Sequence, residues 1–304
     1  MKISVVIPVF NELESLPGLV EELKINLNNF KEWEVIFVDD GSSDKSNNWL
    51  FKLSNENDNF KLIQFFRNYG KSAALSEGFK NAKGDYIITM DADLQDDPAE
   101  IPNLINKLEE GWDLVSGWKK NRLDPLNKTL PSKLFNFVTR IVTGIKIHDF
   151  NCGLKGYRQS VIKSINIYGG RHRYIPALAG QRKFRVTEII VNHRERKFGK
   201  TKYGGSRIFH GFFDLITILF LNKYTQQPLH LFGFIGLGFL IFGLLAETLA
   251  LYYKYFLGHF FKDHIALLMF GIMFIVIGIQ FFSIGLLGEL MTRYTQGKEN
   301  RVKK

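Results

Sequence analysis

Two long apolar segments near the carboxyl end restrict this chain more than any other feature of its sequence. Leu229–Tyr253 holds one formal charge in 25 residues, and Ile265–Leu290 holds one in 26. A helix needs roughly 20 apolar residues to cross about 30 Å of hydrocarbon, so both segments are long enough. Two such segments only 11 residues apart are rare in soluble cores. The sequence therefore predicts a transmembrane hairpin over 229–292 rather than two buried helices.

The charges that flank the hairpin predict its orientation. The linker 254–264 carries two lysines, whereas the segment before the hairpin and the tail 293–304 ("RYTQGKENRVKK") are rich in Lys and Arg. The positive-inside rule then places both termini and residues 1–228 in the cytoplasm, with the hairpin in the plasma (inner) membrane. The amino-terminal stretch "MKISVVIPVF" lacks the long apolar run and cleavage site of a signal peptide, which agrees with this orientation.

The net charge of +10 hides an uneven distribution. Residues 1–118 carry 11 Lys and Arg against 21 Asp and Glu, whereas residues 119–304 carry 29 against 9. The second half is therefore expected to meet something anionic, either nucleic acid or a membrane surface. Basic residues interleaved with aromatic ones in 182–207 permit nucleic-acid binding. The neighbouring hairpin explains the charge by itself, so we expect a membrane and no nucleic acid.

The first 118 residues alternate short β-rich runs with helical patterns. Continuous apolar strands separated by helices of this length are typical of a mainly parallel α/β sheet with right-handed connections. The predicted strands are Ile3–Val9, Glu34–Val38, Lys61–Phe65 and Tyr86–Met90, and the predicted helices are Leu13–Leu27, Asp44–Leu53, Lys71–Asn81 and Ala99–Glu110.

Several common functions lack sequence support. The turn after the first strand reads "PVFNELES" and has no glycine, so the GxGxxG turn of a nicotinamide-binding domain is absent. No P-loop GxxxxGK[ST] occurs in the chain. Hydride transfer and P-loop ATP hydrolysis are therefore not expected. The single cysteine, Cys152, excludes an internal disulfide framework, and we expect a small buried residue there rather than a nucleophile.

Polar and acidic residues follow three of the predicted strands: Phe10-Asn11-Glu12, Asp39-Asp40-Gly41-Ser42 and Asp91-Ala92-Asp93. Ligands of parallel α/β sheets bind at the carboxyl ends of the strands, so a binding site is predicted at this edge. In "VDDGSSD" (38–44), Ser42, Ser43 or Asp44 could cap the following helix. The two carboxylates before them could also accept hydrogen bonds from a nucleobase or ribose.

The stretch "DYIITMDADLQDDP" (85–98) ends a predicted strand with four carboxylates in seven residues. Like charges this close repel one another, so a metal, lysines or water must lie among them. Asp91, Asp93 and Gln95 alternate along the turn, and three oxygen donors suit Mg²⁺ or Mn²⁺ with phosphate oxygens as further ligands. A solvated acidic turn would have the same residues. The position beside two other acidic strand ends favours a metal–diphosphate site.

Residues 119–228 give weaker patterns. "PSKLFNFVTRIVTGI" (131–145) places its apolar residues close to helical spacing, and "SRIFHGFFDLITILFLNKY" (206–224) is strongly apolar with basic residues at its ends. Either segment could be a core helix. Beside a membrane hairpin, a helix in the membrane interface is the alternative for both, and it is favoured for 206–224.

Several motifs in order resemble one family. "SVVIPVFNE", "VIFVDDGSSD", "FFRNYGKSAALSEGFKNAKGDYIITMDADLQDDP" and "RHRYIPALA" are similar to the inverting glycosyltransferase family two, which has the GT-A fold. Within it the chain resembles the polyprenyl-phosphate glycosyltransferases that act on dolichyl or undecaprenyl phosphate. The resemblance covers about residues 2–205, and the hairpin is similar to the bacterial membrane-anchored branch.

The resemblance implies roles for individual residues. "HRERKFGKTKYG" (193–204) resembles the family's basic loop, in which Arg196 and Lys202 would bind phosphate; a basic surface near anionic lipid is compatible with that role. The family commonly has Ser where this chain has Thr201, which keeps the hydroxyl. The residues implied in nucleotide-sugar binding are Pro8, Phe10, Asn11, Glu12, Asp39, Asp40, Arg67, Lys71, Asp91, Ala92 and Asp93, and those implied in binding Mg²⁺ or Mn²⁺ are Asp91, Asp93 and Gln95.

The implied reaction moves a hexose from a nucleotide-diphosphate sugar, UDP-glucose before GDP-mannose, to a polyprenyl monophosphate with inversion. The second pKa of a phosphate monoester is about 6, so the acceptor is already a nucleophile and needs no strong base. A metal on Asp93 would stabilise the leaving diphosphate, and Arg196 and Lys202 would bring the two anions together. Asp149 in "HDFNCGLKGYR" is a candidate aligner or base, with helix capping as the alternative.

The expected domains are a GT-A glycosyltransferase domain at 1–205, interface helices at 206–228, the hairpin and a basic tail. Hairpin anchors often pack against copies of themselves, which leaves a homo-oligomer open.

A processive polysaccharide synthase shares the first domain, but it would ordinarily have a Q-x-x-R-W motif after the donor site and more spans. All four tryptophans, Trp33, Trp49, Trp112 and Trp118, lie too early for that motif. A non-catalytic scaffold would be expected to lack some of the site carboxylates.

Overall fold

The computed structural model describes residues 1–120, 126–165, 167, 171–195 and 227–296. The chain divides into two compact units, Met1–Leu215 and Ile216–Lys304, which are described separately. The predicted interface helix at 206–224 lies outside the described residues, as does most of the tail.

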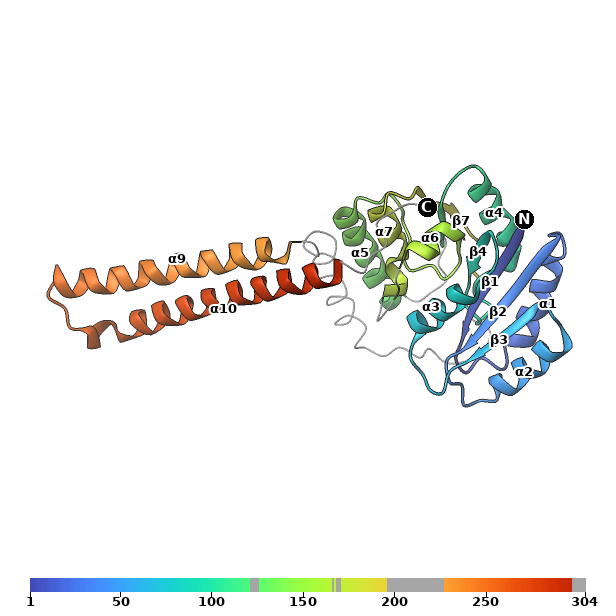
Figure 1. The fold of residues 1–304 in the computed structure, drawn as a ribbon, viewed down its shortest axis with the longest axis horizontal. Helices are drawn as coiled ribbons and strands as arrows, with labels where there is room; N and C mark the ends of the chain where they lie inside the picture. Colours follow the sequence, from blue (N-terminus) through green and yellow to red (C-terminus); the bar gives the residue numbers. More distant parts are fainter. Residues whose placement is uncertain (121–125, 166, 168–170, 196–226, 297–304) are drawn as a thin grey trace. The chain divides into compact units, whose positions relative to one another are not determined.

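A sheet of seven strands forms the centre of the first unit, in the order β3-β2-β1-β4-β6-β5-β7 (Figure 1). β1 pairs in parallel with β2 and β4, and β2 with β3, which confirms the predicted parallel arrangement. β6 runs antiparallel between β4 and β5, and β5 pairs in parallel with β7. The strands are β1 (Lys2–Val9), β2 (Glu32–Asp39), β3 (Phe60–Gln64), β4 (Tyr86–Thr89), β5 (Leu114–Trp118), β6 (Lys155–Arg158) and β7 (Val186–Ile190).

Helices cover both faces of this sheet (Figure 1). Val5 and Ile7 of β1 pack in one apolar cluster with helices α1 and α4, whereas Val6 packs in a second cluster with α3, α6 and α7. Successive side chains of a strand point to opposite faces, so a continuous apolar strand is buried between two helical layers. The helices of this unit are α1 (Leu16–Leu27), α2 (Ser46–Glu56), α3 (Lys71–Asn81), α4 (Ile101–Glu109), α5 (Leu126–Thr143), α6 (Gln159–Ser164) and α7 (Ile175–Gln181), with short 3₁₀ helices η1 (Pro98–Glu100) and η2 (Arg171–Tyr174).

The helices α1 and α2 both begin later than the sequence predicts. α1 starts at Leu16, because Glu12 to Ser15 form a turn in which the Ser15 N–H donates to the Glu12 carbonyl. α2 starts at Ser46 after Lys45, whose φ is +72°. The prediction that Ser42, Ser43 or Asp44 is the N-cap residue is therefore wrong in position. Asp44 nevertheless accepts the N–H of Ser46, the first residue of the helix, at 3.0 Å.

Two features of residues 119–228 are confirmed within the described part. The segment 131–145 is helical up to Thr143, as part of α5, and this helix exposes Phe137 (61%) and Ile141 (65%) while it buries Asn136 and Thr139. Its contact with a membrane remains a prediction. Cys152 is buried, and burial raises the pKa of its thiol to about 12, as expected for a packing residue rather than a nucleophile.

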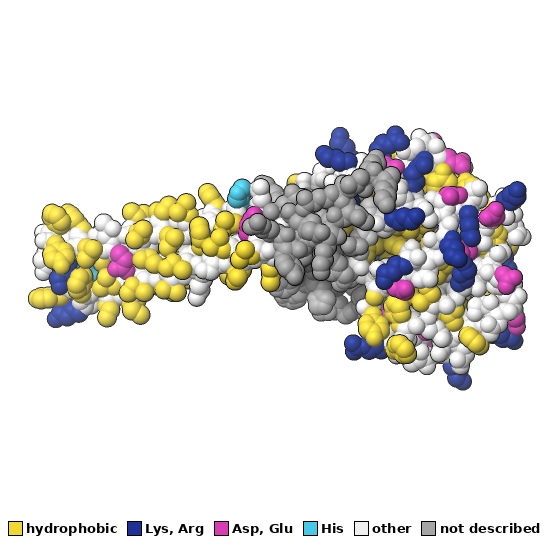
Figure 2. Space-filling view, in the orientation of Figure 1, with side chains coloured by type: hydrophobic (Ala, Val, Ile, Leu, Met, Phe, Trp, Pro, Cys, Tyr) yellow, Lys and Arg dark blue, Asp and Glu magenta, His cyan; other side chains and the backbone are white. Residues whose placement is uncertain are grey.

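The second unit contains two long apolar helices, α9 (Pro228–Tyr255) and α10 (Ile265–Gln296), joined through η3 (Phe261–His264). Their most apolar windows have mean hydropathies of 2.2 and 2.6, and only 17% and 11% of those windows is buried. Figure 2 shows hydrophobic side chains along the outside of both helices. By length and composition, both could cross a membrane, and they contain the two predicted segments.

Glycines allow α9 and α10 to pack closely. A Cβ on Gly236 would lie 2.8 Å from the carbonyl oxygen of Gly278, and one on Gly243 would lie 2.8 Å from that of Gly271. Phe239 of α9 stacks on Phe281 of α10 with ring centroids 5.8 Å apart. Small residues are common where membrane helices meet, because close backbone approach maximises van der Waals contact.

We expect Gly243→Val to destabilise the hairpin, because the added atoms would overlap the backbone of α10. The cost should be roughly 1–3 kcal/mol, as for other overpacked positions. Thermal unfolding of the detergent-solubilised protein, followed by helical circular dichroism, measures it. Gly238→Val is the matched control, since a Cβ at Gly238 meets nothing within 4 Å among the described residues. Equal melting temperatures for the two variants would contradict this packing.

Candidate active site

Three polar segments meet at the carboxyl ends of neighbouring strands. β1 lies between β2 and β4, and all three run parallel, so the residues that follow them lie at one edge of the sheet. The sequence-predicted site residues are at this edge as follows: Pro8 in β1; Phe10, Asn11 and Glu12 after it; Asp39 and Asp40 at the end of β2; Arg67 before α3 and Lys71 as its first residue; and Asp91, Ala92, Asp93 and Gln95 after β4.

Hydrogen bonds join the turn after β1 to the turn after β2. The Asn11 N–H donates to Ser42 Oγ at 2.9 Å, and the Ser43 N–H donates to Asn11 Oδ1 at 2.7 Å. The Leu13 N–H donates to Asp44 Oδ2 at 3.0 Å. Asn11 has a φ of +52°, a conformation that Asn tolerates better than most residues. The hydroxyl and carboxylate groups of "GSSD" therefore hold the two turns together.

Asp40 fixes the loop that leads into α3. Its carboxylate accepts the N–H of Tyr69 at 2.7 Å and that of Gly70 at 2.9 Å. Burial raises the pKa of Asp40, and these two N–H donors partly oppose that increase. A Cβ on Gly41, whose φ is +72°, would lie 2.5 Å from the backbone of Arg67, so this loop packs directly on the turn after β2.

Asp39 and Arg67 complete this part of the edge. Asp39 is buried, which raises the pKa of its carboxyl, and its oxygens lie 3.3 and 3.4 Å from the Ser42 N–H. The Arg67 guanidinium lies 5.0 Å from the ring centroid of Tyr69, in a cation–π arrangement. A buried carboxylate pair beside an exposed cation and an aromatic ring could bind a polar ring system and an adjacent phosphate.

Basic side chains from separate segments neutralise the acidic turn after β4. Lys71 pairs with Asp91 Oδ1, and Lys119 lies 2.8 Å from Asp96 Oδ1. Burial alone would raise the pKa of Asp91, but the charge and hydrogen bond of Lys71, together with the charge of Lys119, outweigh it and lower that pKa to about 2. Asp96 likewise raises the pKa of Lys119 although Lys119 is buried. Lysines therefore lie among these carboxylates, which is one of the arrangements that the sequence left open.

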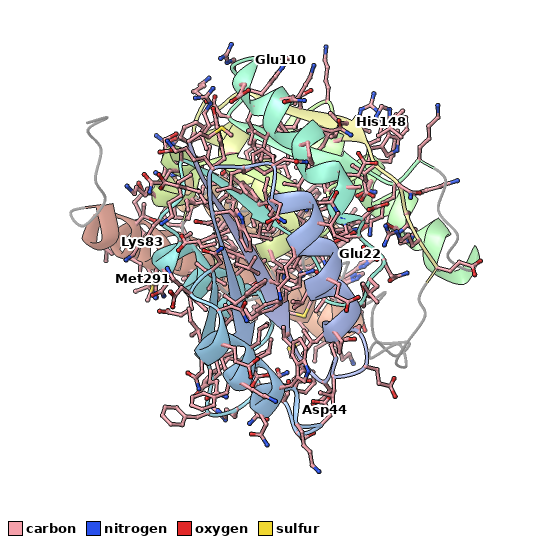
Figure 3. All side chains as sticks on the ribbon, turned by 90° about the vertical axis from the view of Figure 1, so that its right-hand side faces the viewer. Glu22, Asp44, Lys83, Glu110, His148 and Met291 are labelled. Atoms are coloured by element: carbon pink, nitrogen blue, oxygen red, sulfur yellow. The ribbon has the colours of Figure 1, made fainter. Side chains whose placement is uncertain are left out.

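Arg194 neutralises the last carboxylate of the turn. Its guanidinium lies 2.7 Å from Asp97 Oδ1 and 2.6 Å from Oε2 of Glu22, which is on α1 (Figure 3). The Arg194 N–H donates to the Gln95 carbonyl at 3.1 Å. The segment after β7 is therefore bound along the turn after β4. Arg194 then provides a structural ion pair next to the predicted site.

Gly153 packs closely against the carboxylates of Asp91 and Asp96. A Cβ at this position would lie 2.7 Å from both Asp91 Oδ2 and Asp96 Oδ2. Its carbonyl accepts the hydroxyl of Thr89 at 2.9 Å, and the Asp91 N–H donates to Asp96 Oδ2 at 3.0 Å. The position of Asp91 is thus fixed by its own backbone, by Asp96 and by the backbone of Gly153.

Asp149 lies in the buried segment before β6. Its Oδ1 accepts the Asn151 N–H at 3.0 Å, and its carbonyl accepts the Ser116 hydroxyl at 3.1 Å. No helix begins at residues 144–154, all of which are described, so helix capping by Asp149 is wrong. Its carboxylate stabilises a turn instead. A role as aligner or base remains a prediction.

The "RHRYIPALA" motif contacts the first turn of α3. His172 in η2 lies with Nδ1 2.9 Å from Ser72 Oγ, and its N–H donates to the same hydroxyl at 3.1 Å. Burial and the nearby charge of Lys71 hold the pKa of His172 well below its usual value. The imidazole is therefore neutral and anchors η2 against the residue that follows Lys71.

The predicted Mg²⁺ or Mn²⁺ site can be compared with these contacts. Among the described residues, no group of three or more His, Cys, Asp and Glu side chains is arranged to hold a metal. A cation shared with a diphosphate needs only one or two carboxylates, with phosphate oxygens and waters as the other ligands. Asp91 and Asp93 supply two carboxylates on one turn, and Asp91 already binds the ammonium of Lys71. Asp93 Oδ1 accepts the Gln95 N–H at 3.2 Å, which orients the turn. These residues fit a metal–diphosphate site.

The sequence missed several residues that shape the site. Lys119, Gly153 and Arg194 were not predicted, although the surplus of carboxylates after β4 required basic partners from elsewhere. The predicted phosphate-binding residues Arg196 and Lys202, with Thr201, lie outside the described residues.

Comparisons with known proteins show the family. Residues 4–165 match the model of the family described as glycosyl transferase family 2. The chain is 38% identical over 302 residues to the dodecaprenyl-phosphate galacturonate synthase of Rhizobium johnstonii, covering 96% of this chain and 88% of that protein. It is 40% identical over 294 residues to the undecaprenyl-phosphate 4-deoxy-4-formamido-L-arabinose transferase of Salmonella paratyphi B, with the same coverage.

Solved structures share the fold at lower identity. Glucosyl-3-phosphoglycerate synthase from Mycobacterium tuberculosis, in complex with phosphoglyceric acid, is 18% identical with a TM-score of 0.58, covering 73% of this chain and 79% of that one. The same enzyme with Mn²⁺, UDP-glucose and glycerol 3-phosphate is 19% identical with a TM-score of 0.54 and the same coverage. These likenesses confirm the GT-A fold of the first unit.

We expect Gly153→Ala to destabilise the first unit, because the added methyl would push Asp91 and Asp96 from their partners. The loss should be roughly 1–3 kcal/mol, as for other overpacked sites. Tryptophan fluorescence during thermal unfolding measures it, since all four tryptophans lie in this unit. Gly18→Ala is the control: its nearest contact would be an ordinary 3.6 Å from Leu94, and Ala favours a helix. A Gly153→Ala protein as stable as Gly18→Ala would contradict this close packing.

We expect the folded protein to lose stability as pH falls below about 6.5, the ordinary pKa of histidine. The pKa of His172 is lower in the folded state, so below this pH the unfolded chain binds a proton that the folded chain does not. Melting temperatures of the wild type and His172→Gln between about pH 7.5 and 5.5 test this. The variant cannot titrate at that position, so its melting temperature should fall less. Identical decreases would show that His172 contributes nothing to the acid sensitivity.

Proposed function

Since this chain belongs to glycosyl transferase family 2, we propose that it transfers a sugar from a nucleotide-diphosphate sugar to a polyprenyl phosphate, with inversion, at the cytoplasmic face of a membrane. It is a glycosyltransferase, and the names of the two relatives described above both include a polyprenyl phosphate. The observation that carries the proposal is the sheet edge at which Asp39 and Asp40, at the end of β2, and the Asp91–Asp93 turn, after β4, lie on the two sides of β1. Asp39 and Asp40 would bind the nucleoside of the donor, and the Asp91–Asp93 turn would bind its diphosphate.

The donor end of the site is assigned to the loops after β1, β2 and β4. Asp39 and Asp40 would bind the nucleoside, and Arg67 and Lys71 would approach the phosphates. A divalent cation on Asp91 and Asp93 would neutralise the charge that develops on the leaving diphosphate. Mn²⁺ and UDP-glucose are bound together in one solved protein of the same fold, which supports this class of donor.

The requirements for the acceptor end of the site follow from the chemistry of a phosphate monoester. Its second pKa is about 6, so the lipid phosphate is largely dianionic and attacks without a strong base. Bringing it to an anionic donor requires cations, and the basic segment with Arg196 and Lys202 is proposed for that role. Asp149 would then only align groups around the site. The hairpin would keep the catalytic domain, residues 1–205, near an acceptor that stays in the bilayer.

The identity of the sugar is the finer part of the proposal. We keep a UDP-linked hexose, with UDP-glucose first and GDP-mannose next, as the donors to test. The sugars in the names of the two relatives are galacturonate and 4-deoxy-4-formamido-L-arabinose. A uronic acid and a formamido pentose therefore belong in the donor panel.

We expect transfer of label from one radiolabelled nucleotide sugar into chloroform-extractable lipid when the detergent-purified protein is given undecaprenyl phosphate and Mn²⁺ or Mg²⁺. EDTA should abolish it. Asp93→Asn should lower it at least about a hundredfold, because metal stabilisation of a leaving group is worth several kcal/mol. Asp58→Asn, on an exposed acid away from the site, is the matched control. Nucleotide binding without transfer from any donor would indicate the wrong acceptor or a non-catalytic scaffold.

A further inference from the structure

Lys71 forms an ion pair with Asp91, one of the carboxylates that a metal would need. It is the first residue of α3, and its ammonium pairs with Asp91 Oδ1 at the end of β4. The side chains of Lys71 and Asp91 are 25% and 35% exposed, so the pair can be reached from solvent. A cation bound to both Asp91 and Asp93 would compete with this ammonium for the same oxygen.

The backbone on both sides of Lys71 is anchored. Tyr69 and Gly70, just before it, donate their N–H groups to Asp40. Ser72, just after it, binds His172. The Cα atom of Lys71 is therefore held in place between the residues proposed to bind the nucleoside and those proposed to bind the diphosphate. Only its flexible four-carbon stem is able to move the ammonium from one acceptor to another.

Asp91 is fixed as well, so it cannot follow the lysine. Its N–H is bound to Asp96, and Gly153 lies against its other oxygen. Asp96 has its own partner in Lys119, whose side chain is only 12% exposed. The Asp96–Lys119 pair is thus a permanent structural pair, and Lys71 is the cation that can leave Asp91.

We propose that Lys71 is a resident counter-ion of Asp91, which a divalent cation displaces and which then moves onto the diphosphate of the donor. The inference rests on the proposed metal–diphosphate site and assigns Lys71 as a positioning residue within it. A bare metal ion must compete with the ammonium and binds weakly. A nucleoside diphosphate gives the displaced ammonium a new anionic partner, so metal and diphosphate strengthen each other's binding, and linkage requires this effect to be reciprocal.

The test measures Mn²⁺ binding without nucleotide, from the electron paramagnetic resonance signal of free Mn²⁺ titrated with the full-length protein in detergent. Lys71→Gln keeps a hydrogen-bond donor for Asp91 and removes the charge. We expect it to bind Mn²⁺ at least about tenfold more tightly than the wild type. Lys80→Gln, on an exposed lysine of the same helix paired with Glu77, should bind as the wild type does. Lys71→Gln combined with Asp93→Asn should lose the gain.

A second measurement repeats the titration with UDP. UDP should tighten Mn²⁺ binding in the wild type, and this enhancement should be at least about threefold smaller in Lys71→Gln, a change that a purely structural lysine would not produce.

Unchanged or weaker Mn²⁺ binding by folded Lys71→Gln overturns the proposal, as does an equal gain in Lys80→Gln. If Lys71→Gln does not fold, Lys71→Met replaces it, and failure of both to fold also overturns the proposal, since it makes Lys71 a structural cation. The measurement without nucleotide uses neither donor nor acceptor, so failure of sugar transfer leaves its result standing.

Discussion

Charge compensation around the turn after β4 is the constraint on which the rest of the first unit depends. Four carboxylates within seven residues at a strand end repel one another, so cations that lie between them stabilise the turn. The chain supplies these cations from distant segments: Lys71 begins α3, Lys119 follows β5 and Arg194 follows β7. Each pair therefore fastens a different part of the chain to the same turn. The arrangement of β5, α3 and the segment after β7 is coupled in this way to the site.

The donor edge has a second set of contacts, in which the donors are backbone N–H groups rather than cationic side chains. Backbone N–H groups after β1 donate to hydroxyl and carboxylate oxygens after β2, and Asp40 accepts two N–H groups from the loop before α3. These bonds link Asp40 to Lys71 through Tyr69 and Gly70. A group that binds at the nucleoside end therefore acts on a loop whose next residue carries the cation at the diphosphate end.

The hairpin follows different physics. In hydrocarbon the helices gain nothing from burying apolar surface against each other, so close backbone contact at Gly236 and Gly243 takes over that role. Under the proposed function, the excess of basic charge in residues 119–304 would complement an anionic lipid surface and a lipid phosphate. A transferase whose acceptor remains in the bilayer needs both properties in one chain.

The sequence by itself determined the parallel strands β1 to β4, the helices between and after them, the two apolar segments and the polar strand ends, because each is encoded by local periodicity and composition. It did not predict β5 to β7, because their sequences, LVSGW, KGYR and VTEII, are short and lack the continuous apolar pattern of β1. Nor did it show that Asp149 stabilises a turn or that Asp40 holds a loop. Only the tertiary structure decided which cation meets which carboxylate, since ion pairs between Lys71 and Asp91, or Arg194 and Asp97, are set by the crossing of strands and loops.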